Sequence, residues 1–331
     1  MTKTSKKPDS LSDKVSVSTS RNSEVKTEKL TPRKIGIIAP CGYPDFPEHW
    51  SIELTKERSS DQKSELAGYK LRNGKKEGAP ALIVFHGFGE YTGRYMHWAN
   101  HLDGFLGEIW AIDHLGHGRS QGKRGHTEDL KLFTEDMDQF LRKVLSETKS
   151  KKVFAIGHSF GGLLIRRALM EKKSAFERLS GVLVSAPYLG LRIKVPAVKE
   201  FAAKILSKAW SGLSLRTEFD PSVLTQDPRV QEAYHEDRLN HSRMTPGMYR
   251  EIVKSQNELL RTDVEVKVPV GMWISVDDPL VDGEKAVKFY ENHLKGEKRE
   301  IFPWHGFRHE MMNDLNKGAF FESIQKWMEK N

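Results

Sequence analysis

The chain has a single cysteine, Cys41, among 331 residues, so no internal disulfide can form and a cysteine-rich metal site is excluded. It also lacks any apolar run that approaches the roughly 18 residues of a membrane-spanning helix. The first 30 residues are basic without an apolar stretch, so we expect no secretory signal. These absences favour a reducing, cytoplasmic location, which is compatible with peripheral contact with a membrane.

A strong excess of charge is also missing from the body of the chain. The formal net charge is +8, but residues 1–34 contain nine Lys/Arg against four Asp/Glu, which accounts for most of it. We therefore expect no nucleic-acid partner. Residues 1–34 are rich in Ser, Thr and Lys and lack hydrophobic periodicity, which predicts a disordered basic leader. The alternative is a loose tether to anionic surfaces.

Short apolar runs alternate with amphipathic stretches along most of the chain. Continuous apolar strands that alternate with helices indicate an α/β fold with a mostly parallel central sheet flanked by helices. The expected strands are Ala81–Phe85, Ile109–Ile112, Lys152–Ile156, Leu179–Val184, Val268–Ile274 and Arg299–Phe302, with edge strands near Trp50–Leu54 and Leu66–Leu71. The expected helices are Leu130–Thr148, Gly161–Glu171, Glu284–Leu294 and Gly318–Lys330.

The alternation stops between about Tyr188 and Leu260, and a compact domain rarely contains a structureless loop of that length. We interpret residues 188–260 as a helical cap inserted into a core made of residues 35–187 and 261–331. Within the cap, residues 195–215 carry apolar side chains at helical spacing on one face and Lys199, Lys204 and Lys208 on the other. This helix either covers the core or forms a lid that guides an acyl chain and touches lipid surfaces.

The segment Lys152–Leu164 is the main functional signal. A predicted strand runs into Gly157-His158-Ser159-Phe160-Gly161 and a predicted helix follows, which is the context that a Gly-x-Ser-x-Gly nucleophile requires. The serine must lie on a sharp, strained turn, where side chains two residues before and after would clash. We therefore predict Ser159 as nucleophile, with the Phe160 N–H facing the developing oxyanion.

A second oxyanion donor is expected where strand Ala81–Phe85 ends in His86-Gly87-Phe88-Gly89-Glu90. Small residues there let the backbone approach the nucleophile, and we assign the Phe88 N–H. The alternative is an ordinary glycine-containing loop between a strand and a helix.

A serine hydroxyl needs a nearby imidazole to accept its proton and a carboxylate to orient that imidazole. In this arrangement the acid and then the base follow the serine along the chain. Asp278, directly before Pro279, is our choice of acid, with Asp277 as its rival. His309 is our choice of base, with His305 as its rival. His309 also begins a His-x-x-x-x-Asp string that ends at Asp314, which we interpret as a coincidence rather than an acyltransferase signature.

Four passages together resemble the monoglyceride lipase and lysophospholipase branch of the α/β-hydrolases: HGFGEYTGRY from His86, DHLGHGRSQGKRG from Asp113, GHSFGG from Gly157, and DDPLVD followed by GFRHE. The resemblance covers about three quarters of the chain. It implies the same nucleophile, acid, base and oxyanion donors as the reasoning above.

The resemblance also implies that Glu90 and Arg94 lie near the head-group end of the site, and we count them with His158 as substrate-binding candidates. The alternative for Glu90 and Arg94 is an ion pair that holds the loop. Asp113, His114 and His117 fall on a loop that the branch keeps for packing, and nothing completes a metal-ligand set around them. We also expect no base near Cys41.

We therefore predict a serine carboxylic-ester hydrolase that needs no cofactor or metal and acts on single-chain lipid esters, either monoacylglycerols or lysophospholipids. The cap is expected to contact membrane surfaces transiently. The alternatives are an acyltransferase, carboxylesterase or thioesterase with the same triad, or a non-catalytic binding module. The sequence does not indicate the oligomeric state.

Overall fold

The computed structural model describes residues 30, 34, 46–192, 206–207, 209–217 and 220–331. Nearly all of the predicted leader lies outside these residues, as do Cys41 and the larger part of the 195–215 helix. Their predicted roles therefore remain predictions.

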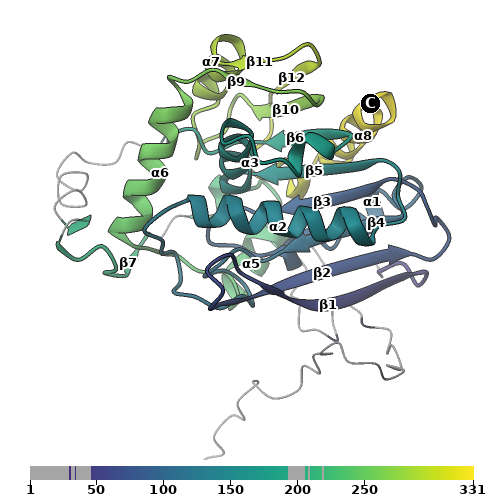
Figure 1. The fold of residues 1–331 in the computed structure, drawn as a ribbon, viewed down its shortest axis with the longest axis horizontal. Coiled ribbons are helices and arrows are strands. Elements are labelled where there is room, and N and C mark those ends of the chain that lie inside the picture. Colours follow the sequence, from purple (N-terminus) through teal and green to yellow (C-terminus); the bar gives the residue numbers. More distant parts are fainter. Residues whose placement is uncertain (1–29, 31–33, 35–45, 193–205, 208, 218–219) are drawn as a thin grey trace, which may run out of the picture.

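Eight strands form one twisted sheet in the order β1-β2-β4-β3-β5-β6-β10-β12 (Figure 1). The first two strands pair antiparallel with each other, β2 pairs antiparallel with β4, and all the other neighbours are parallel. The strands are β1 (Trp50–Arg58), β2 (Glu65–Asn73), β3 (Ala81–Phe85), β4 (Glu108–Ile112), β5 (Val153–His158), β6 (Gly181–Ser185), β10 (Val270–Ser275) and β12 (Arg299–Trp304). The prediction of a mostly parallel sheet is therefore confirmed.

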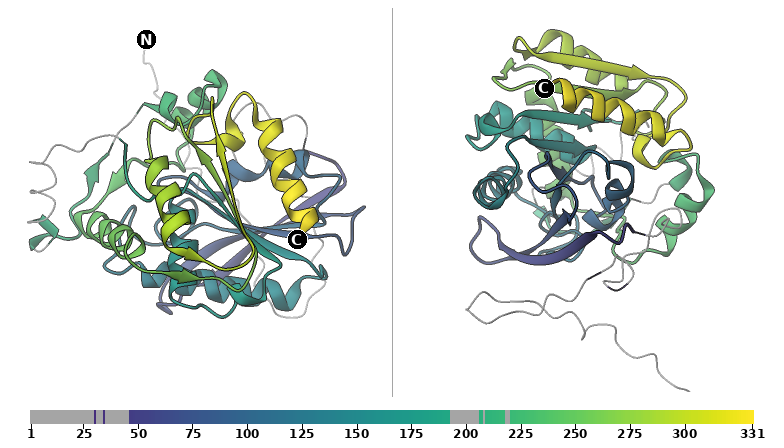
Figure 2. Two further views of the ribbon diagram at one scale, coloured as in Figure 1. Left: turned by 90° about the horizontal axis from the view of Figure 1, so that it is seen from above. Right: turned by 90° about the vertical axis from the view of Figure 1, so that its right-hand side faces the viewer.

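Helices cover both faces of this sheet. Figure 2 shows α2 and α3 on one side and α8 on the other. The helices are α1 (Trp98–His101), α2 (Lys131–Glu147), α3 (Phe160–Met170), α5 (Pro228–Glu236), α6 (Pro246–Leu259), α7 (Gly283–Asn292) and α8 (Lys317–Lys330). Among the described residues, four 3₁₀ turns accompany them: η1 (Thr92–Tyr95), η2 (Phe176–Arg178), η3 (Pro221–Val223) and η4 (Met311–Asn313). No helix of the described residues is long and apolar enough to cross a membrane.

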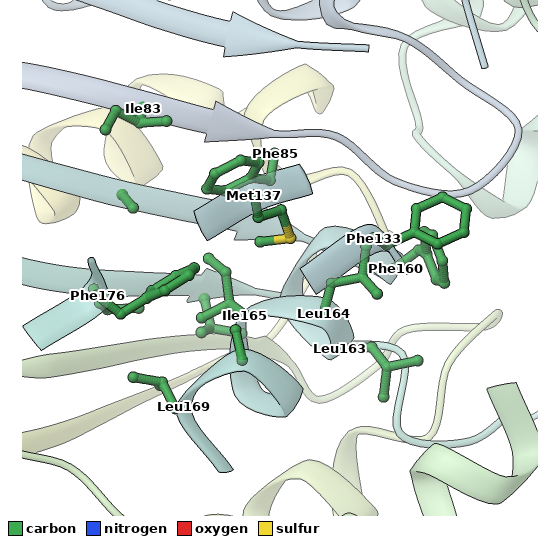
Figure 3. Close-up of a cluster of buried hydrophobic side chains, with 14 of the residues drawn as sticks. Ile83, Phe85, Phe133, Met137, Phe160, Leu163, Leu164, Ile165, Leu169 and Phe176 are labelled. Carbon is green, nitrogen blue, oxygen red and sulfur yellow. The ribbon is translucent and has the colours of Figure 1, made fainter. Parts of the chain in front are cut away.

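Alternating side chains of the central strands belong to two separate hydrophobic clusters, one on each face of the sheet. On β3, Ile83 and Phe85 join the cluster that α2 and α3 cover, whereas Leu82 and Val84 join the cluster under α8. Figure 3 shows Phe85, Met137 and Phe160 in the first cluster. Because successive strand residues point to opposite faces, an all-apolar strand is stable only when both faces are covered. This burial fixes the strand ends from which the loops at the carboxyl edge of the sheet emerge.

The described part of residues 188–260 lies at the carboxyl ends of the parallel strands, with α6 and β7 on the left of Figure 1. It contains η3, α5 and α6, and Asp220, Asp227 and Thr245 cap their N-termini. A short antiparallel pair, β7 (Leu215–Arg216) with β8 (Arg243–Met244), also lies there, although the sequence indicated helices alone. Elsewhere, β9 (Val264–Glu265) pairs with β11 (Leu294–Lys295).

Candidate active site

Ser159 lies between β5 and α3 in a strained backbone conformation. Its φ of 52° and ψ of −110° place a non-glycine residue in a rarely occupied region. A Cβ added at Gly161 would collide with the carbonyl oxygen of Phe85, and one at Gly157 would lie 2.5 Å from the carbonyl oxygen of Gly161. The two glycines therefore allow the turn that puts Ser159 at the strand end.

The loop after β3 lies against this turn. A Cβ on Gly87 would come within 3.4 Å of both the Ser159 Cβ and the His158 ring. The Phe88 ring packs edge-on against the Phe160 ring at 5.8 Å between centroids. The structure thus brings together the two residues predicted as oxyanion donors.

Two hydrogen bonds orient the peptide between Gly87 and Phe88. The Nε2 atom of His86 accepts from the His114 N–H at 2.9 Å, so its Nδ1 carries the proton and donates to the Gly87 carbonyl at 2.8 Å. Burial lowers the pKa of His86 to about 3, so the imidazole stays neutral. Because C=O and N–H point in opposite directions across a trans peptide, the bond to Gly87 turns the Phe88 N–H the other way.

His309 and Asp278 form a buried pair. His309 Nδ1 lies 2.7 Å from Asp278 Oδ2, and the two side chains are 4% and 0% exposed. The other Asp278 oxygen accepts from the N–H groups of Leu280 at 2.8 Å and Val281 at 3.0 Å. One oxygen of the carboxylate is therefore held by two backbone N–H groups, while the other faces the imidazole.

The rival acid and base pair with each other at the surface. His305 Nδ1 lies 3.1 Å from Asp277 Oδ2, with side-chain exposures of 74% and 54%. Asp277 and His305 therefore take no part in the buried pair of Asp278 with His309. Asp314 accepts from the N–H groups of Arg308 and Gln226 and thus ties loops together.

The His309 ring lies beside the serine turn. Its centroid is 4.8 Å from that of His158, the residue that precedes Ser159. Burial lowers the pKa of His309, but the charge and hydrogen bond of Asp278, together with the charges of Glu310 and Glu90, outweigh burial. The pKa therefore lies above its ordinary value of 6.5. The geometry therefore presents a basic, oriented imidazole near the strained serine.

Glu90 and Arg94 are buried and paired inside the protein. Arg94 bonds Glu90 at 2.5 Å and also Glu310, a residue that the sequence did not indicate, at 2.6 Å. These contacts favour the loop-holding role over direct contact with substrate. His158 is also buried, and burial places its pKa well below the ordinary value.

The Asp113 loop is part of the packed interior. Asp113 accepts from the N–H groups of Thr92 and Arg119 at 2.8 Å each and from the hydroxyl of Tyr69 at 3.0 Å. Within the part of the chain that the structure describes, no group of three or more His, Cys, Asp or Glu side chains is arranged to bind a metal ion.

Comparison with known proteins places these features in a family. Residues 77–316 match the Hydrolase_4 family, described as serine aminopeptidase, S33. Rat monoglyceride lipase is 32% identical over 259 residues, which cover 77% of this chain and 84% of that protein. Phospholipase YtpA of Bacillus subtilis is 26% identical over 75% of this chain and 95% of its own length.

A solved structure shows the same likeness. The crystal structure of Paleococcus ferrophilus monoacylglycerol lipase superimposes with a TM-score of 0.67 at 30% identity, covering 80% of this chain and 98% of that one. The chain spans only 26% of the length of a longer relative, an abhydrolase domain-containing protein of Dictyostelium discoideum.

Proposed function

Because this chain belongs to the Hydrolase_4 (S33) family of the α/β-hydrolases, we propose that it is a serine carboxylesterase that cleaves single-chain lipid esters. The observation that carries the proposal is the buried hydrogen bond between His309 and Asp278, beside a serine on a strained turn. In α/β-hydrolases the nucleophile, the acid and the base follow one another in this order along the chain.

In the proposed reaction, the Ser159 hydroxyl attacks the ester carbonyl and His309 Nε2 takes its proton. Asp278 stabilises the resulting imidazolium, and the N–H groups of Phe88 and Phe160 bind the tetrahedral oxyanion. His309 then protonates the leaving alcohol. Water, activated by the same imidazole, hydrolyses the acyl-enzyme and frees the fatty acid. The reaction needs no cofactor or metal.

Two observations support a lipid substrate. The relatives named above include a monoglyceride lipase, a phospholipase and a monoacylglycerol lipase. In the proposed cap, Trp210, Leu213 and Leu215 are 67%, 45% and 39% exposed. Exposed large apolar side chains of this kind are compatible with contact with lipid. Such contact would deliver a substrate with a long acyl chain to the strand ends below.

A panel of lipid esters tests this function. We expect hydrolysis of monoacylglycerols or lysophospholipids, and loss of at least about 1,000-fold in rate in Ser159→Ala, because the nucleophile is removed. Ser180→Ala is a matched control, since Ser180 lies before β6 at the opposite end of the sheet. Release of fatty acid in the presence of glycerol, measured against acyl transfer to glycerol, identifies the acceptor. Undiminished hydrolysis by Ser159→Ala would contradict the proposal.

A further inference from the structure

A buried cluster of one guanidinium and two carboxylates lies beside the proposed triad. Glu90, Arg94 and Glu310 have side chains that are 4%, 2% and 3% exposed. Arg94 Nη1 donates to Glu90 at 2.5 Å and to Glu310 at 2.6 Å, and its Nη2 donates to the second Glu310 oxygen at 2.7 Å. A planar fork suits two carboxylates at once, whereas a lysine ammonium does not reproduce it.

One end of this cluster fixes the oxyanion loop. The second oxygen of Glu90 accepts from the Gly87 N–H at 2.6 Å and from the Tyr95 hydroxyl at 2.7 Å. The Gly87 carbonyl is bound by His86 at 2.8 Å. Both peptide groups that flank Gly87 are therefore constrained. The second of these groups includes the Phe88 N–H.

The other end fixes the base loop. Glu310 directly follows His309, and its carboxylate also accepts from the Asn313 amide at 2.8 Å. Its backbone N–H donates to the Leu224 carbonyl in the 188–260 region at 2.7 Å. The backbone that bears the imidazole is therefore anchored through both the side chain and the N–H of the adjoining residue.

The same cluster touches helix α5. The Arg94 guanidinium lies over the Tyr234 ring, with its Cζ 4.9 Å from the centroid. Nearby, the Tyr91 hydroxyl donates to Asp237 at 2.6 Å, and the His241 N–H donates to the Gly89 carbonyl at 2.7 Å. This part of the insertion is fastened to both functional loops.

We propose that Arg94 is a positioning residue that sets the separation between the oxyanion N–H of Phe88 and the imidazole of His309 by binding Glu90 and Glu310 together. The inference rests on the proposed function. The reacting carbonyl must meet both groups at once in the transition state, and a displacement of about 1 Å can cost 100-fold in rate. Arg94 therefore acts on kcat through the two carboxylates, without contact with the substrate.

The cluster also shapes the electrostatic field at His309. Asp278 faces the ring from the loop after β10, Glu310 from its own loop and Glu90 from the loop after β3, and all three raise its pKa against the effect of burial. His158 faces it from the end of β5, and burial keeps that imidazole neutral. Removing the Glu310 charge therefore makes the base less readily protonated.

The test measures kcat, KM and the pH profile of kcat/KM on a water-soluble p-nitrophenyl ester for Arg94→Lys and Glu310→Gln. We expect kcat to fall about 10- to 100-fold in each variant while KM changes less than about 3-fold. In Glu310→Gln, the acid limb of the profile also moves to lower pH, which a purely structural role would not produce.

Arg167→Lys is the matched control. Arg167 also bridges two carboxylates, Glu171 at 2.7 Å and Glu258 at 3.3 Å, at the far end of α3. This variant should lose stability without loss of kcat. If Arg94→Lys fails to fold, Glu310→Gln, which keeps the side-chain shape, carries the test.

Two failures are distinguishable. If Ser159→Ala is inactive but both cluster variants keep wild-type kcat and acid limb, the positioning role of Arg94 is wrong and the proposed function stands. If Ser159→Ala stays active, the proposed function fails and the positioning role fails with it.

Discussion

Two histidine–carboxylate pairs lie a few residues apart, and burial separates them at the scale of the residue. His309 with Asp278 is enclosed, whereas His305 with Asp277 is exposed to water. An exposed pair contributes little because solvent screens it, while the enclosed pair changes the basicity of its imidazole. The sequence favoured Asp278 and His309 over these rivals, but only the structure shows how differently the two pairs are buried.

We expect the pH profile of kcat/KM to report His309. The reaction needs the neutral imidazole, and the pKa of His309 lies above 6.5, so activity should rise with pH through a midpoint above 6.5. In Asp278→Asn the carboxylate charge that raises the pKa of His309 is lost, so the effect of burial, which lowers this pKa, dominates. The midpoint should move to lower pH, while kcat falls by about 10⁴. Initial rates between about pH 5 and about pH 9 measure both. An unchanged midpoint in Asp278→Asn would contradict the assignment of the acid.

Several residues of the site could be predicted from the sequence because their chemistry is local. The two glycines that allow the Gly-x-Ser-x-Gly turn lie within the five residues of the motif itself. The proposed acid and base each follow the end of a predicted strand. Glu310 and its bond to Arg94 could not be predicted, since they join residues 216 positions apart. The pairing of Glu90 with the Gly87 N–H also depends on a loop geometry that no pattern shows.

At the scale of the element, β5 shows both the strength and the limit of pattern. Its apolar core was predicted, but the strand continues through Gly157 and His158 and ends directly before Ser159. Glycine and histidine weaken a strand signal, whereas pairing of Gly157 with Phe85 and of His158 with Ser185 extends it. Likewise, β1 reaches Arg58 through pairing with β2, although its sequence turns polar.

The turn between β5 and α3 yields a prediction about glycine. Gly161→Ala should destabilise the protein by at least about 2 kcal/mol and abolish activity, because its Cβ would collide with the Phe85 carbonyl oxygen in the strand beside it. Gly318→Ala in α8 meets no atom within 4 Å and should stabilise by roughly 0.5–1 kcal/mol. Urea unfolding measures both, and equal effects of the two substitutions would contradict the crowding at the turn.

At the scale of the whole molecule, five histidines are buried as neutral groups with lowered pKa. Burial is the main cause for each: His86 and His97 titrate near 3, and His114, His117 and His158 lie well below 6.5. In the unfolded chain these imidazoles take up protons below about pH 6.5. The unfolded state then binds more protons than the native state.

Stability should therefore fall as pH drops below about 6.5, by on the order of 1 kcal/mol per buried histidine for each pH unit. Asp113, Glu90 and Asp136, whose pKa burial raises, and His309, whose pKa also lies above its ordinary value, act in the opposite direction but are fewer. Urea-unfolding midpoints at about pH 7 and about pH 5.5 measure the sum. A midpoint that stays constant or rises at the lower pH would show that the histidines are not buried as neutral groups.

The sheet is buried on both faces, so its central strands are continuous apolar runs. These runs are why the strands could be predicted from the sequence. The proposed cap, residues 188–260, was predicted only from a gap in the alternation of strands and helices. Its attachment to the oxyanion and base loops, through Leu224, Tyr234 and His241, depends on backbone groups and a ring contact. These contacts fasten the described part of the proposed cap to the loops of the candidate site.

The central claim is that Ser159 is a nucleophile activated by His309. Reaction with a fluorophosphonate, followed by peptide mass mapping, tests it most directly, because the probe bonds only to an activated serine hydroxyl. We predict one adduct, on Ser159, formed at least about 100-fold more slowly in His309→Ala and absent in Ser159→Ala. An adduct on another serine, or labelling at the wild-type rate in His309→Ala, would contradict the account.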